Sequence, residues 1–501
     1  MSNKLEHYKA LIEKLQNEEL RSDALNDLKN FLVFEVTVDN ISIVQNVGIS
    51  KILNCLELSD KLQIELTCEV LKACFEKFET VDIIKMYTAN IMYLLRHEHD
   101  CVRRMVIDGI CKTVTSGVML PLPKYIDVYV AVAQTVCDND VGIANKAVLI
   151  TSNLPTEAYP KVLEEMKIAL ESTSSSKCNA YEVIINISSK SYELFNLSVN
   201  EGYIEFMVNE LHSNDILYQL NILELLTQLA ITPHGINHLV KQGTFQKISE
   251  LVRDIHNNPF GGLLIPGYMK FFGSIAHYYP KEIFQKYPIL LESLFDAMSS
   301  DDTTILPVAL DTLGFIGTTI EGKMCLMALG SKYTQNVEKL CLLIKNSPTE
   351  IKVRALYCMA SLIGINKDPN SKVEPIDQRV TLMTREWFRT LSQQPGPMDV
   401  LFNICKNPFP DIQLAGLTLL DAVCQHQWGE EMVSRVAGFI EYLLDRSVDF
   451  TKESKEAKYD IIKQLSQSAA FDENIISRLQ KYVEQGPFYT EIVTQVAMEG
   501  E

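Results

Sequence analysis

The chain has 501 residues, of which 47% are hydrophobic and 22% are charged, with 22 glycines and 18 prolines. This composition is typical of a globular protein with a large core, and so few glycines and prolines disfavour a many-stranded β-protein. The net charge of −18 and the lack of a long apolar run disfavour partners bound through phosphates or lipid, so we expect no nucleic acid and no membrane.

The cysteines and the start of the chain bear on the cellular compartment. Twelve cysteines lie between Cys55 and Cys424, and no two of them form a C-x-x-C pair. We therefore expect them to be small buried hydrophobic residues. The first residues, Met1 to Tyr8, are polar and do not resemble a signal peptide. These features predict a cytoplasmic location, and a nuclear one is equally compatible with them.

Short polar turn signals recur along the chain, and an amphipathic run follows each of them. In chain order they are Asp60, Asp100, Asp140, Lys177, Asp215, Pro259, Asp302, Pro348, Asp411 and Glu453. The steps between them are 40, 40, 37, 38, 44, 43, 46, 63 and 42 residues, a period that indicates HEAT or armadillo repeats. The single long step contains residues 366–375, which we expect to form an inserted loop.

The runs after the turns have helical spacing, as in Ile216–Leu226 and Ile351–Ala360. In six of the repeats a second landmark lies about twenty residues after the turn signal, because a helical repeat of this length needs a break between its helices. The landmarks are Gly117, Thr156, Gly235, Pro280, Gly322 and Gly429. We expect glycine there because helix ends often need a left-handed residue.

These patterns predict an all-α fold, an armadillo/HEAT-like α-solenoid superhelix of about ten to eleven repeats. We expect one continuous solenoid over residues 1–501, with a C-terminal tail from about 486 to 501. The segment Lys452–Lys458 is polar, as the outer face of an end repeat should be. Such a superhelix has a concave face, where a protein partner usually binds.

One segment partly matches a phosphate-binding loop. Gly317–Met324 fits G-x-x-x-x-G-K, but Met324 stands where the motif needs a serine or threonine. Since the preceding residues have helical spacing, we expect a turn between helices. The chain has no G-x-S-x-G, no H-E-x-x-H and no dinucleotide motif, so we predict a protein that is not an enzyme and that has no cofactor.

Three other groups carry ligand-type or basic side chains. Every residue of His97–Cys101 is a potential metal ligand, but no second cluster completes a site, so we expect a helix end with Asp100 as the cap and no metal. His234 and His238 lie at a helix break and are expected to be structural. The basic cluster Arg96, Arg103 and Arg104 indicates a solvated turn between repeats, and the alternative is a local contact with an anion.

The concave face should be lined by the helix that precedes each break. Polar residues spaced three and four apart on these helices form stripes, which we predict to bind a protein partner, although a solvated surface would show similar stripes. The predicted partner-binding residues are Glu224, Gln228, Lys270, Ser274, His277, Asp311, Thr318, Arg354, Tyr357, Ser361, Thr418, Asp421 and Gln425.

Several segments resemble a known family more closely than the repeat pattern alone would. They are Pro266–Gly273, Phe439–Val448, Lys455–Tyr459 and Gly486–Tyr489. In order and spacing they are similar to the 26S proteasome non-ATPase regulatory subunit 5 family, the armadillo/HEAT-like assembly chaperones of the proteasome regulatory particle. The resemblance is specific from about residue 215 onward, whereas earlier residues match in repeat phase. Pro233 departs from the histidine expected there.

The resemblance implies a chaperone for the base of the regulatory particle that is not part of the mature 26S proteasome. Such a protein binds the C-terminal domain of one proteasomal ATPase subunit, in a module with a second ATPase and the large non-ATPase scaffold subunit. Binding through the concave face would hinder premature docking on the core particle. The chaperone needs neither a nucleotide nor a metal.

Two other functions compete with that of a chaperone. An importin-like armadillo cargo adaptor would line its groove with tryptophan and asparagine ladders, but Trp387 and Trp428 both lie outside the predicted stripes. An enzyme would need several titratable groups converging in one pocket. Co-purification with ATPase subunits would favour the chaperone, and co-purification with import cargo would favour the adaptor.

Overall fold

The structure is a computed structural model that describes residues 2–35, 49–57, 60–77, 80–254, 260–300, 302–365, 377–448 and 451–490. Within these ranges every regular element is a helix and no strand occurs, which confirms the all-α prediction. None of the helices described combines the length and the apolar character that a bilayer span needs. The predicted loop at 366–375 and tail residues 491–501 lie outside the described residues.

The chain divides into two compact units, Met1–His238 and Leu239–Glu501, and the expectation of one continuous solenoid stays a prediction. The helices of the first unit, the last of which contains the boundary, are α1 (Ser2–Lys14), α2 (Arg21–Asn30), α4 (Ile49–Asn54), α5 (Lys61–Lys77), α6 (Thr80–Met86), α7 (Thr88–Leu94), α8 (Asp100–Thr115), α9 (Ile126–Gln134), α10 (Val141–Ser152), α11 (Tyr159–Ala169), α12 (Ser174–Ser188), α13 (Tyr192–Asn200), α14 (Tyr203–Asn209), α15 (Ile216–Ala230) and α16 (Pro233–Lys241).

The helices of the second unit are α17 (Thr244–Asp254), α18 (Gly261–Tyr278), α19 (Pro280–Lys286), α20 (Pro288–Ala297), α21 (Leu306–Gly317), α22 (Ile320–Ala328), α23 (Ser331–Asn346), α24 (Thr349–Ile363), α25 (Gln378–Arg389), α26 (Pro397–Cys405), α27 (Pro410–Cys424), α28 (Gln427–Ser434), α29 (Phe439–Leu444), α30 (Lys452–Leu465) and α31 (Glu473–Gln485). Short 3-10 turns and one short π-helix occur between helices of the first unit. The helix count per repeat, two or three, agrees with the sequence pattern.

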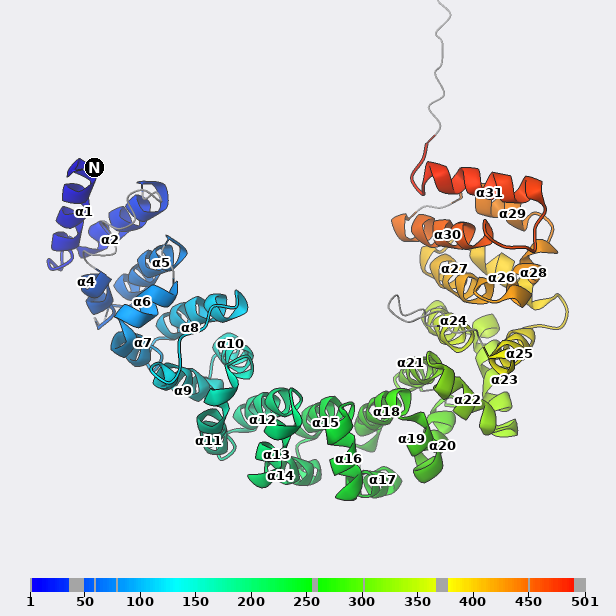
Figure 1. Cartoon of the computed structure of the whole chain (residues 1–501), viewed down its shortest axis with the longest axis horizontal. Helices are drawn as coiled ribbons and strands as arrows, with labels where there is room; N and C mark the ends of the chain where they lie inside the picture. The colour runs from blue at the N-terminus through cyan, green and yellow to red at the C-terminus, as the bar shows by residue number, and fades with distance from the viewer. Residues whose placement is uncertain are drawn as a thin grey trace, which may run out of the picture. The chain divides into compact units, whose positions relative to one another are not determined.

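Within each unit one helix per repeat packs on the equivalent helix of the next repeat. In the first unit this row, here called the inner row, is α5, α8, α10, α12 and α15, and in the second it is α18, α21, α24, α27 and α30. Figure 1 shows each inner row along the concave edge of its own unit. The shorter helices lie behind the row and pack on one another, as α19 does on α22.

Helix α24 shows why these sequences form such a row. Its apolar residues recur at three and four, and Leu356 and Met359 are fully buried at 0% exposure. Burying a side chain of this size stabilises the fold by about 1.5–3 kcal/mol. Because α24 packs on both α21 and α27, its apolar face completes the core of two neighbouring repeats.

The cysteines differ in burial. Seven of them are buried, as expected for small hydrophobic residues, and five are only partly buried; the five are Cys101, Cys111, Cys137, Cys178 and Cys325. All twelve are free thiols. Burial raises the pKa of the Cys358 thiol well above its ordinary value, so this side chain stays neutral inside α24.

Some of the turn signals are helix caps. The Asp140 carboxylate accepts from the backbone N–H of Ile143 at 2.9 Å, and Asp215 caps α15 in the same way. The prediction that Asp100 is a cap is wrong. His99 holds the cap position without a side-chain bond, and Asp100 is the first residue of α8. Its carboxylate lies 3.6 Å from Arg104, one turn further on.

The glycine landmarks have a different cause from the one expected. Gly117 has φ +79°, but Gly235, Gly322 and Gly429 do not have positive φ and lie inside the helices that follow the break. A Cβ atom at Gly235 or Gly322 would lie 2.1 Å from the carbonyl oxygen six residues earlier, and at Gly429 2.0 Å from that of Val423. Glycine is needed there because the new helix starts directly against the end of the inner helix.

Donors from neighbouring repeats bind the carbonyls that end the inner helices. His234 Nε2 lies 2.9 Å from Ser188 O at the end of α12, and His426 Nε2 lies 2.9 Å from Ile363 O at the end of α24. Since a carbonyl only accepts, each Nε2 carries the proton.

The segment that partly matched a phosphate loop is, as expected, a turn between helices. Its Lys323 is fully buried and donates to Gly317 O and to Ser361 O.

The glycine contact gives the first prediction. Gly429→Ala should lower the free energy of unfolding by about 2–3 kcal/mol, because a methyl group at this site would overlap the Val423 carbonyl and force the backbones apart. Urea unfolding followed by circular dichroism measures the change.

The matched control is Gly262→Ala in the first turn of α18, where nothing lies within 4 Å of the new Cβ. That change should cost nothing or add up to about 1 kcal/mol. Equal midpoints for Gly429→Ala and wild type would show that the helix junction tolerates a side chain.

The buried lysine gives the second prediction. Burial lowers the Lys323 pKa from 10.5 to about 7, so above pH 7 the folded chain releases a proton that the unfolded chain still holds. The stability of wild type relative to Lys323→Met should therefore rise with pH between about 7 and 10, with a limiting slope of about 1.4 kcal/mol per pH unit. Urea midpoints at several pH values measure it, and a difference that stays flat over this range would contradict the prediction.

Candidate functional site

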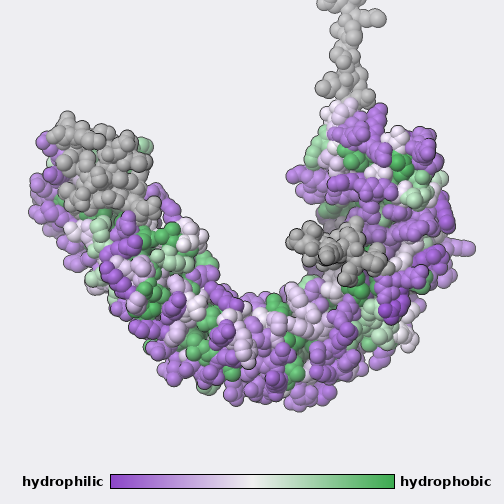
Figure 2. All heavy atoms as spheres, viewed as in Figure 1, coloured by the Kyte–Doolittle hydropathy of each residue, from purple (hydrophilic) through white to green (hydrophobic). Residues whose placement is uncertain are grey.

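The thirteen predicted partner-binding residues all lie on inner-row helices or at their ends. Two are on α15 of the first unit, Glu224 and Gln228. The other eleven are in the second unit, on α18, α21, α24 and α27, where Thr318 and Gln425 are the residues directly after a helix. Every one of the thirteen is exposed or half-buried, so all are accessible from the surface of their own unit. Figure 2 shows hydrophilic side chains over most of the visible face of each unit, with only small hydrophobic patches.

Six of these residues meet in one groove of about 240 Å³ in the second unit. They come from three successive repeats and are Thr318, Tyr357, Ser361, Thr418, Asp421 and Gln425. Small residues between them, Ala360, Gly364 and Ala422, form the rest of the lining. The helical spacing therefore predicted a set of side chains that the structure brings together, which we call the polar groove.

The polar groove holds a short hydrogen-bond chain. Gln425 Nε2 donates to an Asp421 carboxylate oxygen at 3.0 Å, while Gln425 Oε1 accepts from the backbone N–H of Ile365 at 2.6 Å. Burial raises the pKa of Tyr357, helped by the charge of Asp411 and opposed by a hydrogen bond with Thr418. Its phenol is therefore a neutral hydrogen-bonding group at pH 7. Polar groups of this kind can pair with the backbone of a bound segment.

An aromatic pair borders the same region, and it joins the predicted stripe residue His277 to Phe315, which the polar stripes did not include. The rings of His277 and Phe315 stack with centroids 3.9 Å apart and planes 8° from parallel. His277 Nδ1 lies 2.8 Å from Phe315 O and 3.1 Å from the Thr318 hydroxyl, so this nitrogen carries the proton. Phe315 stays 40% exposed, which gives the face an apolar contact beside the groove. Its position four residues after Asp311 was the available sequence signal.

The charged members of the stripes are not equally available to a partner. Arg354 Nη1 lies 2.5 Å from Asp311 of the previous repeat and its Nε lies 3.9 Å from Glu350. By contrast, Lys270 is exposed and forms no ion pair with any described residue. Among the described residues, the charge of Lys270 is therefore free to meet a charge on a partner, as is that of Glu224 in the first unit.

The first unit has a second polar groove that the sequence stripes did not include. It has a volume of about 360 Å³, lies between α10 and α12, and is lined in part by Asn145, Glu182, Asn186 and Lys190. Glu182 and Asn186 are four residues apart, so the same spacing rule could have found them. Burial lowers the Lys190 pKa and raises that of Glu182. Neither of the α15 residues, Glu224 or Gln228, lines this groove.

The other sequence candidates have structural partners. Two nitrogens of Arg103 lie 2.6 and 2.9 Å from the Asp138 carboxylate, Arg104 pairs with Asp140, and Arg96 donates to the side-chain oxygen of Gln134. Acceptors on the side chains of residues 134–140 therefore hold the basic cluster. His97 Nε2 lies 3.0 Å from Leu56 O. No group of three or more His, Cys, Asp or Glu among the residues that the structure describes is placed to hold a metal ion. Trp387 and Trp428 are buried at 8% and 5% exposure.

Comparisons with known proteins point to the same proteasomal family over most of the chain. A family model described as proteasome non-ATPase 26S subunit matches residues 4–501. The 26S proteasome non-ATPase regulatory subunit 5 of Bos taurus is 28% identical over 452 residues, 87% of this chain and 88% of the relative. The protein of that name from Drosophila melanogaster is 25% identical over 501 residues, 97% of each chain.

Among solved structures, importin beta in an ammonium sulfate condition is similar with a TM-score of 0.61 and 12% identity. The match covers 95% of this chain and 58% of importin beta. At this identity the likeness shows the fold alone. It confirms the solenoid of helical repeats that the sequence period predicted.

Proposed function

The chain belongs to the proteasome non-ATPase 26S subunit family, and we propose that it is an assembly chaperone for the base of the proteasome regulatory particle. Its partners in this proposal are the C-terminal domain of one proteasomal ATPase subunit, a second ATPase subunit and the large non-ATPase scaffold subunit. It acts in the cytoplasm or nucleus, is not part of the mature 26S proteasome, and works as a binding protein without a cofactor.

The observation that carries the proposed binding face is the polar groove of the second unit. Side chains from α21, α24 and α27 converge there, and the Phe315 ring lies on the same row of helices. A surface that combines exposed aromatic rings with hydrogen-bonding groups is typical of protein interfaces. Proteasomal relatives together with this surface favour a protein ligand over a small molecule as the main partner.

The proposed mechanism is steric. A folded ATPase C-terminal domain held against a row of helices loses access to whatever surface the solenoid covers, and its C-terminal tail is then hindered from docking on the core particle. No bond is made or broken, so the whole effect depends on binding energy and on the bulk of the chaperone. Release follows when the base joins the core particle.

The third prediction tests the face. The double variant Lys270→Glu with Tyr357→Ala should weaken capture of the ATPase C-terminal domain at least about tenfold, since it reverses an unpaired charge and removes an exposed ring. Arg354 is left unchanged because reversing it would break the ion pair with Asp311 and confuse folding with binding. A pull-down with the purified domain measures capture.

The matched control, Lys161→Glu with Tyr192→Ala, makes the same changes at exposed positions on α11 and α13 of the first unit, away from the inner row. It should bind as wild type does. Circular dichroism and the melting temperature show that both variants are folded. Full capture by the folded Lys270–Tyr357 variant, or an equal loss in the control, would move the binding face elsewhere.

A further inference from the structure

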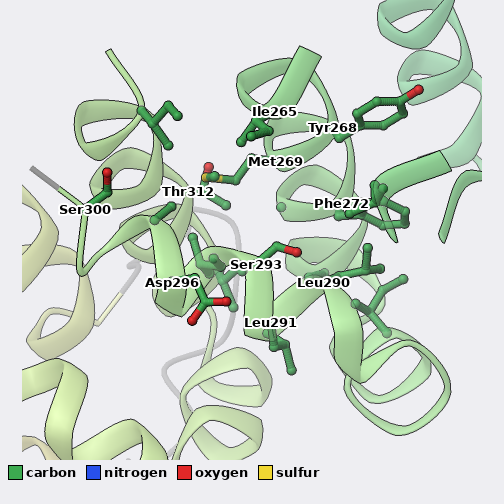
Figure 3. A pocket seen from close by; sticks show the side chains of 18 residues that line it. Ile265, Tyr268, Met269, Phe272, Leu290, Leu291, Ser293, Asp296, Ser300 and Thr312 are labelled. Atoms are coloured by element: carbon green, nitrogen blue, oxygen red, sulfur yellow. The ribbon is translucent and has the colours of Figure 1, made fainter. Parts of the chain in front are cut away.

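The second unit contains an apolar cavity of about 230 Å³ that the proposed function does not use. It lies between α18, α20 and α21, and Figure 3 shows the side chains around it. Met269, Phe272, Leu290 and Leu294 contribute to its wall, and each is at most 7% exposed. The wall is therefore part of the hydrophobic core, and the space within it is not filled by those side chains.

Residue size explains why the cavity stays open. At Gly273 the helices α18 and α21 approach so closely that a Cβ would lie 2.4 Å from the Thr312 methyl carbon, which fixes their separation. One turn on, Ala276 also lines the cavity, as does Ala297 of α20. Because these two side chains are small and the helix spacing is fixed nearby, the walls cannot collapse to fill the gap.

One charged residue contributes to the lining of this mainly apolar cavity. Asp296 of α20 lines the cavity and is exposed, so the cavity reaches the surface beside it. Its carboxylate forms no hydrogen bond or ion pair with any residue of the described part. The Ser293 hydroxyl, also in the lining, donates to Ile289 O at 3.0 Å and keeps its lone pairs free to accept. Both polar groups can accept a hydrogen bond from a cation.

We propose that this cavity is a binding site for a small apolar molecule that carries a cationic amine. The apolar body fills the space between α18, α20 and α21, and the ammonium group meets Asp296 at the opening. A dry cavity of about 150 Å³ admits benzene, so this larger one has room for a ring with a short chain. The negative charge at the opening selects an amine over a neutral or anionic molecule of the same shape.

The test compares three probes of one shape on the full-length chain. 4-Phenylbutylamine should bind and raise the melting temperature, 4-phenylbutan-1-ol should bind more weakly, and 4-phenylbutyrate should bind at least about tenfold more weakly than the amine. Calorimetry and a thermal-shift series measure the three affinities. Failure of all three probes to bind at millimolar concentration would overturn the proposal and leave a packing gap.

Two variants locate the bound amine. Ala276→Leu places a larger side chain in the cavity and should abolish binding of both the amine and the alcohol. Asp296→Asn keeps the cavity and the fold, because the side chain is exposed, and should bring the affinity of the amine down to that of the alcohol. Asp127→Asn, an exposed change on α9 of the first unit, is the control and should leave every affinity unchanged.

The variants also give the result that would overturn the proposal. If the amine binds the Asp296→Asn chain as tightly as wild type, the carboxylate does not select the ligand. Equal binding by a folded Ala276→Leu chain would place the amine elsewhere on the molecule. Neither result depends on the proteasomal ATPase, so this inference and the proposed function can fail separately.

Discussion

The ends of the inner-row helices impose the constraint on which the rest of this structure depends. Each helix ends with carbonyl groups that have no partner inside the helix, and in a stacked array those groups are buried against the next repeat. The fold satisfies them with side chains from neighbouring repeats: Lys190 donates to Ser152 O, His234 Nε2 to Ser188 O, and Gln464 to Cys424 O. An uncapped end would cost about 1–3 kcal/mol for each buried carbonyl. Hydrogen bonds therefore set the register between repeats that hydrophobic packing alone leaves loose.

The ends of the inner-row helices also explain where the polar groove lies. Ser361 and Gly364 are at the end of α24, and Gln425 directly follows α27. Gln425 both lines the groove and accepts from the backbone N–H of Ile365. Side chains that serve a helix end are necessarily polar and are held in place by that hydrogen bond. A row of helices whose ends are capped in this way offers a partner a set of polar groups already ordered, which lowers the entropy lost on binding.

Sequence reasoning could predict the fold and six of the residues that line the polar groove, for a definite reason. Helical spacing and a period of about forty residues depend on local geometry. The inner row and the convergence of Tyr357, Thr418 and Gln425 could therefore be predicted from the sequence. Contacts between repeats could not be predicted from the sequence, because they depend on which side chains meet across about forty residues of chain. The Arg354 ion pair with Asp311 and the His277 stack on Phe315 are of this kind. The positions of the landmark glycines could be predicted from the sequence, but the close backbone contact that requires glycine there could not.

One contact shows that the packing between repeats does not depend on how many residues a repeat contains. His426 Nε2 reaches Ile363 O across 63 residues, whereas His234 reaches Ser188 O across 46 and Lys323 reaches Ser361 O across 38. The geometry at the helix end is nevertheless the same, since a histidine donates to a terminal carbonyl at 2.9 Å in both long and ordinary repeats. In an array where each repeat contacts only its neighbours, extra chain between two helices costs only slowly growing loop entropy. The packing of α24 on α27 is thus set by the side chains that these two helices present to each other.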